Sequence, residues 1–202
     1  MRLEIRAIHC LLLAIAAVFT HLATAQNAPE QPPTKPLRAE LALDYSYIRS
    51  NAPPAGCSCF NLNGGSATFA WPVKQGGLAA VGDFTVANAS GISSSKLNLT
   101  LETFTAGARY VPRVGHSPLQ PFGQALIGLA HASGTLVGPG TPGASNAGAA
   151  FAANLGGGLD MHANRRFSVR LVEADYLITG IDNATDDHQN DLRISTGIIV
   201  HF

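Results

Sequence analysis

The last eleven residues of the chain carry the clearest alternation of apolar and polar positions. One face of this segment holds Leu192, Ile194, Thr196, Ile198, Val200 and Phe202, and the other holds Arg193, Ser195, Gly197, Ile199 and His201. Apart from Thr196 and Ile199, the first face is apolar and the second is polar or glycine. A period of two residues predicts a β-strand with one apolar face.

The same period continues upstream as far as residue 37 and predicts eight strands. They are expected at residues 37–49, 62–74, 77–88, 97–111, 119–132, 147–161, 166–178 and 191–202. The connections after the odd-numbered strands are long, at 50–61, 89–96, 133–146 and 179–190, and the others are shorter, at 75–76, 112–118 and 162–165. An even number of strands joined alternately by short turns and long loops is typical of a membrane-spanning barrel.

The two faces of the predicted strands differ in charge. In the first strand Glu40 and Asp44 share one face, and Leu43 and Tyr45 share the other. A soluble sheet would turn its apolar face inward and wet its polar face, and a soluble lipocalin-like binder would likewise need an apolar interior. Here the charges lie beside glycine and alanine, and the apolar face has none. We therefore predict an all-β fold, a closed eight-stranded antiparallel transmembrane β-barrel, with its narrow interior filled by side chains.

Ten charged residues are predicted to face this interior as a structural network. They are Glu40, Asp44, Asp83, Glu102, Arg109, Asp160, Arg170, Glu173, Asp175 and Arg193. Buried charges persist when they are paired, and the carboxylates outnumber the arginines, so some carboxylates must share a partner or reach water.

Two strands break the alternation. Glu173 and Asp175 are out of phase with Arg170 in the seventh strand, and Glu102 is out of phase with Arg109 in the fourth. A β-bulge in each strand, near Thr103 in the fourth, would bring all of these charges to the interior.

Aromatic residues gather toward the short-turn end of the predicted strands. Trp71, Tyr110, Phe122, Phe167 and Phe202 all fall there. Aromatic girdles mark the two membrane interfaces of such barrels, so we expect these rings on the outer surface.

The N-terminal part of the chain predicts export. Residues 1–25 have arginines at the start, an apolar run from Leu11 to Phe19 and the small-residue site Ala23-Thr24-Ala25, which together are typical of a signal peptide. The apolar run is too short for a spanning helix. Residues 26–36 are a Pro-rich periplasmic lead-in, and residues 37–202 form one barrel domain.

Composition excludes several other functions. Lys and Arg number 13 and Asp and Glu also number 13, so the balanced charge predicts no nucleic-acid partner. No pattern indicates a cofactor, and no residue is assigned a catalytic role. Cys57 and Cys59 fall in the first long connection, where a loop disulfide or pairing with another chain is expected rather than a metal site, because zinc takes four ligands.

Several short motifs resemble one family of barrels. They are Tyr45-Ser46-Tyr47-Ile48-Arg49, Ala108-Arg109-Tyr110, Pro121-Phe122-Gly123-Gln124, Leu155 to Asp160, Val172 to Tyr176 and Arg193 to Phe202. In this order and spacing, over residues 37–202, they resemble the OmpA-like (opacity-type) outer-membrane β-barrel family. The resemblance implies a Gram-negative outer-membrane location, a periplasmic N-terminus and a C-terminal strand ending on Phe202 that the barrel-assembly machinery reads. It also implies lipid and lipopolysaccharide as neighbours and, we expect, a monomer.

The resemblance leaves three hypotheses for function. The leading one is a non-enzymatic protein with a structural or surface-recognition role through its four long external loops, whose ligand the sequence does not identify. The second is a small ion or solute pore. The third is a lipid-modifying enzyme, because His131-Ala132-Ser133 is similar to the His-x-Ser pair of outer-membrane lipid A deacylases. No acidic residue follows between Ser133 and Ala150 to orient the histidine, which counts against this third hypothesis.

Overall fold

The computed structural model describes residues 38–50, 60–74, 76–92, 96–112, 117–134, 149–181 and 188–202. The expected signal peptide and lead-in, as well as Cys57 and Cys59, lie outside these residues. The described part of the chain contains no helix that is long and apolar enough to cross a membrane.

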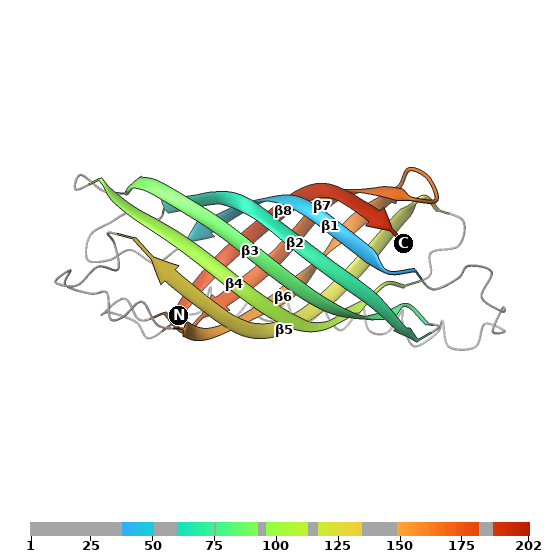
Figure 1. Ribbon diagram of the computed structural model, residues 1–202, viewed down its shortest axis with the longest axis horizontal. Helices are drawn as coiled ribbons and strands as arrows, with labels where there is room; N and C mark the ends of the chain where they lie inside the picture. Colours follow the sequence, from blue (N-terminus) through green and yellow to red (C-terminus); the bar gives the residue numbers. More distant parts are fainter. Residues whose placement is uncertain are drawn as a thin grey trace, which may run out of the picture. The chain divides into compact units, whose positions relative to one another are not determined.

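Eight antiparallel strands close into a barrel in sequence order, and β8 pairs with β1 (Figure 1). The strands are β1 Glu40–Ser50, β2 Phe60–Lys74, β3 Leu78–Ile92, β4 Leu97–Tyr110, β5 Leu119–Ser133, β6 Ala149–His162, β7 Phe167–Thr179 and β8 Gln189–His201. The predicted fold class is thereby confirmed, and the predicted strands lie within a few residues of the observed ones.

The barrel has two ends, which we name by their connections. The turn end holds the starts of β1, β3, β5 and β7 and the last residue, Phe202, whose backbone N–H donates to Ala39 O at 2.9 Å. The loop end holds the C-terminal ends of β1, β3, β5 and β7. One connection there differs from the prediction. β3 continues to Ile92, so only residues 93–96 separate it from β4, whereas residues 111–118 separate β4 from β5 at the turn end.

Strand register confirms one predicted bulge and corrects the other. The β7–β8 pairing shifts between Arg170 and Glu173, so that the side chains of Leu171 and Val172 are both exposed. β4 pairs with β5 without interruption from Thr100 to Tyr110, so β4 has no bulge near Thr103. The irregularity on the other side of β4 lies at its loop end, opposite the segment from Ala89 to Ile92 of β3.

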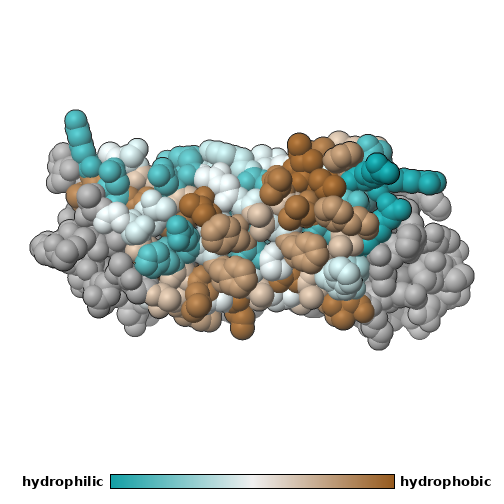
Figure 2. Space-filling view, in the orientation of Figure 1, coloured by the Kyte–Doolittle hydropathy of each residue, from teal (hydrophilic) through white to brown (hydrophobic). Residues whose placement is uncertain are grey.

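Outside the bulge in β7, side chains alternate between the interior and the outer wall along the strands, as the pleat of a β-sheet requires. The outer wall exposes large apolar residues such as Ile127, Leu155 and Phe104, each more than 60 % exposed. Figure 2 shows apolar side chains covering much of the barrel wall. At the loop end the outward positions become polar, with Asn61 and Asn63 on β2, Asn88 on β3 and Asn98 on β4.

Candidate functional site: the barrel interior

One connected network of hydrogen bonds and ion pairs fills the middle of the barrel. Its members are Asp44, Thr68, Asp83, Thr85, Arg109, Gln124, Asp160, Arg170, Glu173, Asp175 and Arg193. Together they come from all eight strands, and all except Asp160 are buried. The alternation of each strand points these residues inward, and the bulge in β7 brings Arg170 and Glu173 to the same side.

Arg193 of β8 uses all three of its guanidinium nitrogens on carboxylates. Nη1 donates to Asp83 Oδ1 at 2.8 Å, and Nη2 donates to Glu173 Oε1 at 2.9 Å. Nε and Nη2 donate to Asp175 Oδ2 at 3.0 and 2.6 Å. The planar arrangement of the guanidinium donors suits several carboxylates at once, so this one side chain links β3, β7 and β8 across the interior.

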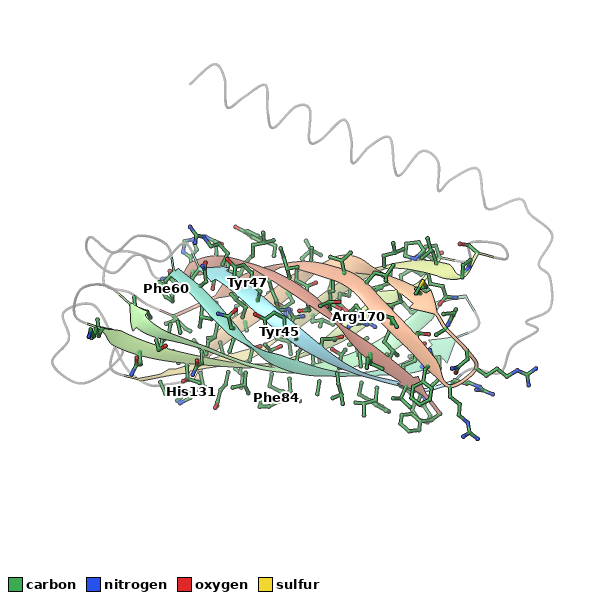
Figure 3. The ribbon with its side chains drawn as sticks, turned by 90° about the horizontal axis from the view of Figure 1, so that it is seen from above. Tyr45, Tyr47, Phe60, Phe84, His131 and Arg170 are labelled. Atoms are coloured by element: carbon green, nitrogen blue, oxygen red, sulfur yellow. The ribbon has the colours of Figure 1, made fainter. Side chains whose placement is uncertain are left out.

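Arg170 of β7 forms a second centre beside the first. Its Nη1 lies 2.7 Å from Glu173 Oε2 and donates to Asp44 Oδ2 at 3.0 Å, and its Nε donates to Asp160 Oδ1 at 3.1 Å. Glu173 therefore shares its two oxygens between Arg170 and Arg193. Figure 3 shows Arg170 within the ribbon cylinder.

Arg109 of β4 completes the set and corrects the predicted position of Phe122. Nε and Nη2 of Arg109 donate to Gln124 Oε1 at 3.1 and 2.8 Å. Phe122 is only 6 % exposed and lies inside, with the guanidinium carbons of Arg109 and Arg170 at 4.2 and 4.9 Å from its ring centroid. It makes cation–π contacts with two arginines and is not part of an outer girdle.

Inward-facing glycines make room for this network. A Cβ atom added at Gly156 would collide with the Asp175 carboxylate, one at Gly197 with the Asp44 carboxylate, and one at Gly158 with the Phe122 ring. An eight-stranded barrel has little interior space, so large charged side chains are accommodated where the facing strand carries no side chain.

Glu102 does not join the interior network, contrary to the prediction. Because β4 has no bulge there, Glu102 is exposed on the outer wall, directly opposite His131 of β5 in the register. His131 and Ser133 share that outward parity, and Figure 3 shows His131 projecting from the wall. The structure thus supplies an acidic neighbour for His131 from the preceding strand, β4, rather than from the residues that follow Ser133.

Apolar side chains pack across the interior at the loop end. Ile48, Leu62, Leu101 and Leu177 are each at most 4 % exposed. They form one buried cluster with Ala87, Ala89, Ile92, Ala130 and Ala152, and Phe60, Leu97, Leu99 and Ile181 pack against it. These apolar side chains come from seven strands. They form a layer between the charged network and the loop-end connections.

A smaller polar cluster lies at the turn end and was not singled out in the sequence. His162 Nδ1 and His201 Nε2 each lie 2.7 Å from Ser168 Oγ, and His201 Nδ1 lies 3.3 Å from Glu40 Oε1. Glu40 was predicted to face the interior, and it does so at this end, apart from the arginine network. The alternation along the strands could have predicted that His162 and Ser168 face the interior. His162 lies two residues after Asp160, and Ser168 lies two residues before Arg170.

The fold defines a class of protein: it is that of the eight-stranded outer-membrane β-barrels. Among solved structures it resembles the Neisserial surface protein A, with a TM-score of 0.62 and 17 % identity over 81 % of this chain and 97 % of that one. It also resembles Ail, the attachment invasion locus protein of Yersinia pestis, with a TM-score of 0.55 and 15 % identity over 83 % of this chain and 100 % of that one. These likenesses confirm the expected resemblance at the level of the fold.

A weaker likeness is to the outer membrane enzyme PagL, with a TM-score of 0.38 and 19 % identity over 79 % of this chain and 98 % of that one. That score is too low to support an inference about this chain. Neither a protein-family model nor a curated protein matches the sequence.

Proposed function

We propose that this protein is a non-enzymatic β-barrel of the Gram-negative outer membrane that holds its loop-end connections at the cell surface in a structural or recognition role. The inverted polarity of the wall carries the proposal. Three arginines and five carboxylates are paired inside the barrel, while residues such as Ile127 and Leu155 are exposed outside. Only an apolar solvent favours that arrangement, because exposed apolar surface is unfavourable in water.

Strand length supports the same proposal. A tilted strand crosses a bilayer in about 9–11 residues, and the eight strands have 11 to 15 residues each. The longest, β2, β3 and β5, carry polar outward residues at the loop end, including Asn61, Asn88 and His131. These ends would rise above the hydrocarbon into the headgroups and sugars of the outer leaflet, where lipopolysaccharide is the expected neighbour.

The interior favours a closed barrel over a pore. A water path would need a continuous polar route, but the buried cluster around Ile48, Leu62 and Leu177 crosses the interior at the loop end. On the turn-end side of this cluster, the arginines and carboxylates contact one another directly. Packed apolar side chains leave no partner for water, and for this reason the pore ranks below the structural role.

Assembly follows from the same geometry. β8 closes the barrel against β1, with Val200 opposite Leu41 and Ile198 opposite Leu43 on the outer wall. We propose that the assembly machinery reads this strand and the adjoining Phe202 from the periplasm, and that the closed barrel is a monomer. A surface ligand would bind at the connections of the loop end.

The lone tryptophan tests the membrane proposal. Trp71 of β2 is 59 % exposed on the outer wall, so refolding into vesicles containing brominated lipids should quench its fluorescence strongly. A matched double variant, Trp71→Phe with Ser90→Trp, moves the probe to the polar loop end and should be quenched weakly by lipids brominated deep in the acyl chain. A chain that folds as a stable monomer without detergent or lipid would overturn the proposal.

A lipid-modifying enzyme stays a second candidate because of one observation. Glu102 and His131 are cross-strand partners on the outer wall near the loop end, so their Cβ atoms lie about 5 Å apart. Ser133, two residues from His131, faces the same way. A serine, a base and an orienting acid are the groups that acyl transfer requires.

The test of this candidate is the acyl composition of lipid A in cells that express the protein. Loss of an acyl chain with the unmodified protein, and its retention with Ser133→Ala, would favour the enzyme. Ser90→Ala, an exposed serine elsewhere at the loop end, is the matched control. Unchanged lipid A in all three strains would exclude the enzyme, and the structural role would remain as the proposed function.

A further inference from the structure

Three exposed arginines lie at the turn end, beside the seam that closes the barrel. Arg38 precedes β1, and Arg165 and Arg166 belong to the turn between β6 and β7. Arg38 Nη1 donates to the backbone oxygen of Arg165 at 2.8 Å, although the two residues are 127 positions apart. Because β8 pairs with both β7 and β1, these arginines flank the end of β8. Figure 3 shows nitrogen-tipped side chains extending beyond the strands at this end.

Hydrogen bonds hold the turn that carries two of these arginines. Asn164 Oδ1 accepts from the backbone N–H groups of Arg166 and Phe167 at 2.8 and 2.9 Å. The backbone N–H of His201 donates to the backbone oxygen of Arg166 at 2.8 Å, which joins the turn to the end of β8. These contacts use the backbone of the turn and leave both arginine side chains exposed. Groups that are already ordered cost less entropy to bind.

No carboxylate side chain neutralises the three arginines within the described part of the chain. Glu102 is the exposed carboxylate there, and it lies near the loop end. Glu40, at the start of β1, contacts His201 at 3.3 Å instead. Arginine keeps its charge in proteins, so the three guanidinium groups outweigh the single carboxylate that Phe202 can contribute. This corner of the turn end is therefore positively charged.

The neighbouring aromatic residues indicate the depth of these charges. Arg166 directly precedes Phe167, and Phe202 follows β8 between the two arginine-bearing elements; both rings are exposed. Exposed aromatic rings mark the edge of the hydrocarbon in outer-membrane barrels. Arginine can lay its apolar stem along such a surface and keep its guanidinium among the headgroups. If the wall spans a bilayer, the three charges lie at the level of the lipid phosphates.

We propose that Arg38, Arg165 and Arg166 bind the headgroup of an anionic phospholipid at the turn end. The inference rests on the proposed membrane location. Guanidinium groups bind phosphate through paired N–H donors, and a phosphodiester held between Arg38 and the turn would connect β1 to β7 across the end of β8. A zwitterionic lipid brings its own cation, which the arginines repel, so the site selects a headgroup with net negative charge.

Native mass spectrometry of the folded barrel in neutral detergent measures this binding. The probes are dioctanoyl phosphatidylglycerol and dioctanoyl phosphatidylcholine, which have the same acyl chains and differ in headgroup. The first phosphatidylglycerol should bind more than about tenfold more tightly, and Arg165→Gln with Arg166→Gln should abolish this preference, at about fivefold for each charge removed. Arg49→Gln, which removes an exposed arginine at the loop end, is the matched control and should keep the preference.

The outcomes separate this inference from the membrane proposal. Equal affinity of the unmodified barrel for the two lipids would overturn the lipid site, and that comparison needs no variant. An equal loss of preference in Arg49→Gln would overturn its assignment to the turn end. Binding of sn-glycerol 3-phosphate as tightly as the lipid would show a site for free phosphate instead. A barrel that folds only with detergent or lipid but shows no preference refutes this inference alone, whereas a stable monomer without either refutes the membrane location.

Discussion

At the residue scale, the buried arginines decide whether the interior is stable. Arg193 holds Asp83, Glu173 and Asp175 with all three of its nitrogens. Losing one partner of a buried ion pair is costly because the remaining charge has neither water nor a counter-ion. The network is therefore sensitive to single substitutions that remove charge.

We expect Arg193→Met to lower the free energy of unfolding by about 3–5 kcal/mol. Urea unfolding in lipid vesicles measures the change. Arg49→Met is the matched control, because Arg49 is exposed and its Nη1 donates to the neutral Asn61 Oδ1 at 2.7 Å; its effect should stay below about 1 kcal/mol. Equal losses in the two variants would contradict the interior network.

A second residue-scale prediction concerns the inward glycines. Gly156→Ala should destabilise the barrel by roughly 1–3 kcal/mol, because the added Cβ meets Asp175 and the backbone of Ala174. Gly82→Ala is the control, since nothing lies within 4 Å of its added Cβ. The same urea titration compares them, and a Gly156→Ala barrel as stable as the control would mean that the interior is not tightly filled.

At the element scale, the apolar outer face distinguishes a membrane strand from a soluble one. Ile127 of β5 is 65 % exposed, and in water its replacement would change stability by less than about 0.5 kcal/mol. In a bilayer we expect Ile127→Arg to cost about 2–4 kcal/mol. Ser90→Arg at the loop end should cost little, and equal small effects in vesicles would contradict the assigned lipid-facing wall.

The closing strand carries the other element-scale prediction. Phe202→Ser should reduce the amount of protein in the outer-membrane fraction several-fold, because the aromatic end of β8 is the proposed assembly signal. Phe167→Ser changes an exposed aromatic of β7 at the same end of the barrel and should leave the level near normal. Immunoblots of fractionated cells measure both. An unaffected Phe202→Ser variant would rule out this signal.

Much of the fold can be predicted from the local sequence pattern. An alternation with a period of two residues predicts both the strand and the face of the strand on which each residue lies. The bulge at Leu171 and Val172 was predictable because the charges on either side of it have opposite parity. The prediction for Glu102 assumes a bulge that brings every strand charge inward, but Glu102 alternates with the outward-facing Phe104 and lies on the outer face. The prediction for Phe122 follows its aromatic type, whereas its position two residues from the inward-facing Gln124 puts it inside.

Other features could not be predicted because they depend on the closed barrel. The contacts of Arg193 with Asp83, and of Arg170 with Asp44, join residues more than 100 positions apart in the sequence. The same is true of the opposition of Glu102 and His131, since strand register is set by pairing across the sheet. A single sequence predicts which face a residue takes, but not which residue it meets.

At the scale of the whole molecule, closure and filling go together. Eight strands leave a narrow interior, and here that interior holds a charged network in the middle and an apolar cluster at the loop end. The wall faces lipid and the inside is occupied by side chains. Any recognition is therefore expected at the ends of the barrel rather than through it.

Conductance in a planar bilayer tests this closed interior most directly. The refolded protein should insert and give no discrete openings at neutral pH, since the cluster around Ile48, Leu62 and Leu177 blocks a water path. Replacing Leu62 and Leu177 with serine serves as a control that removes part of this barrier. Reproducible single-channel openings by the unmodified protein would contradict the closed barrel and make the pore its leading function.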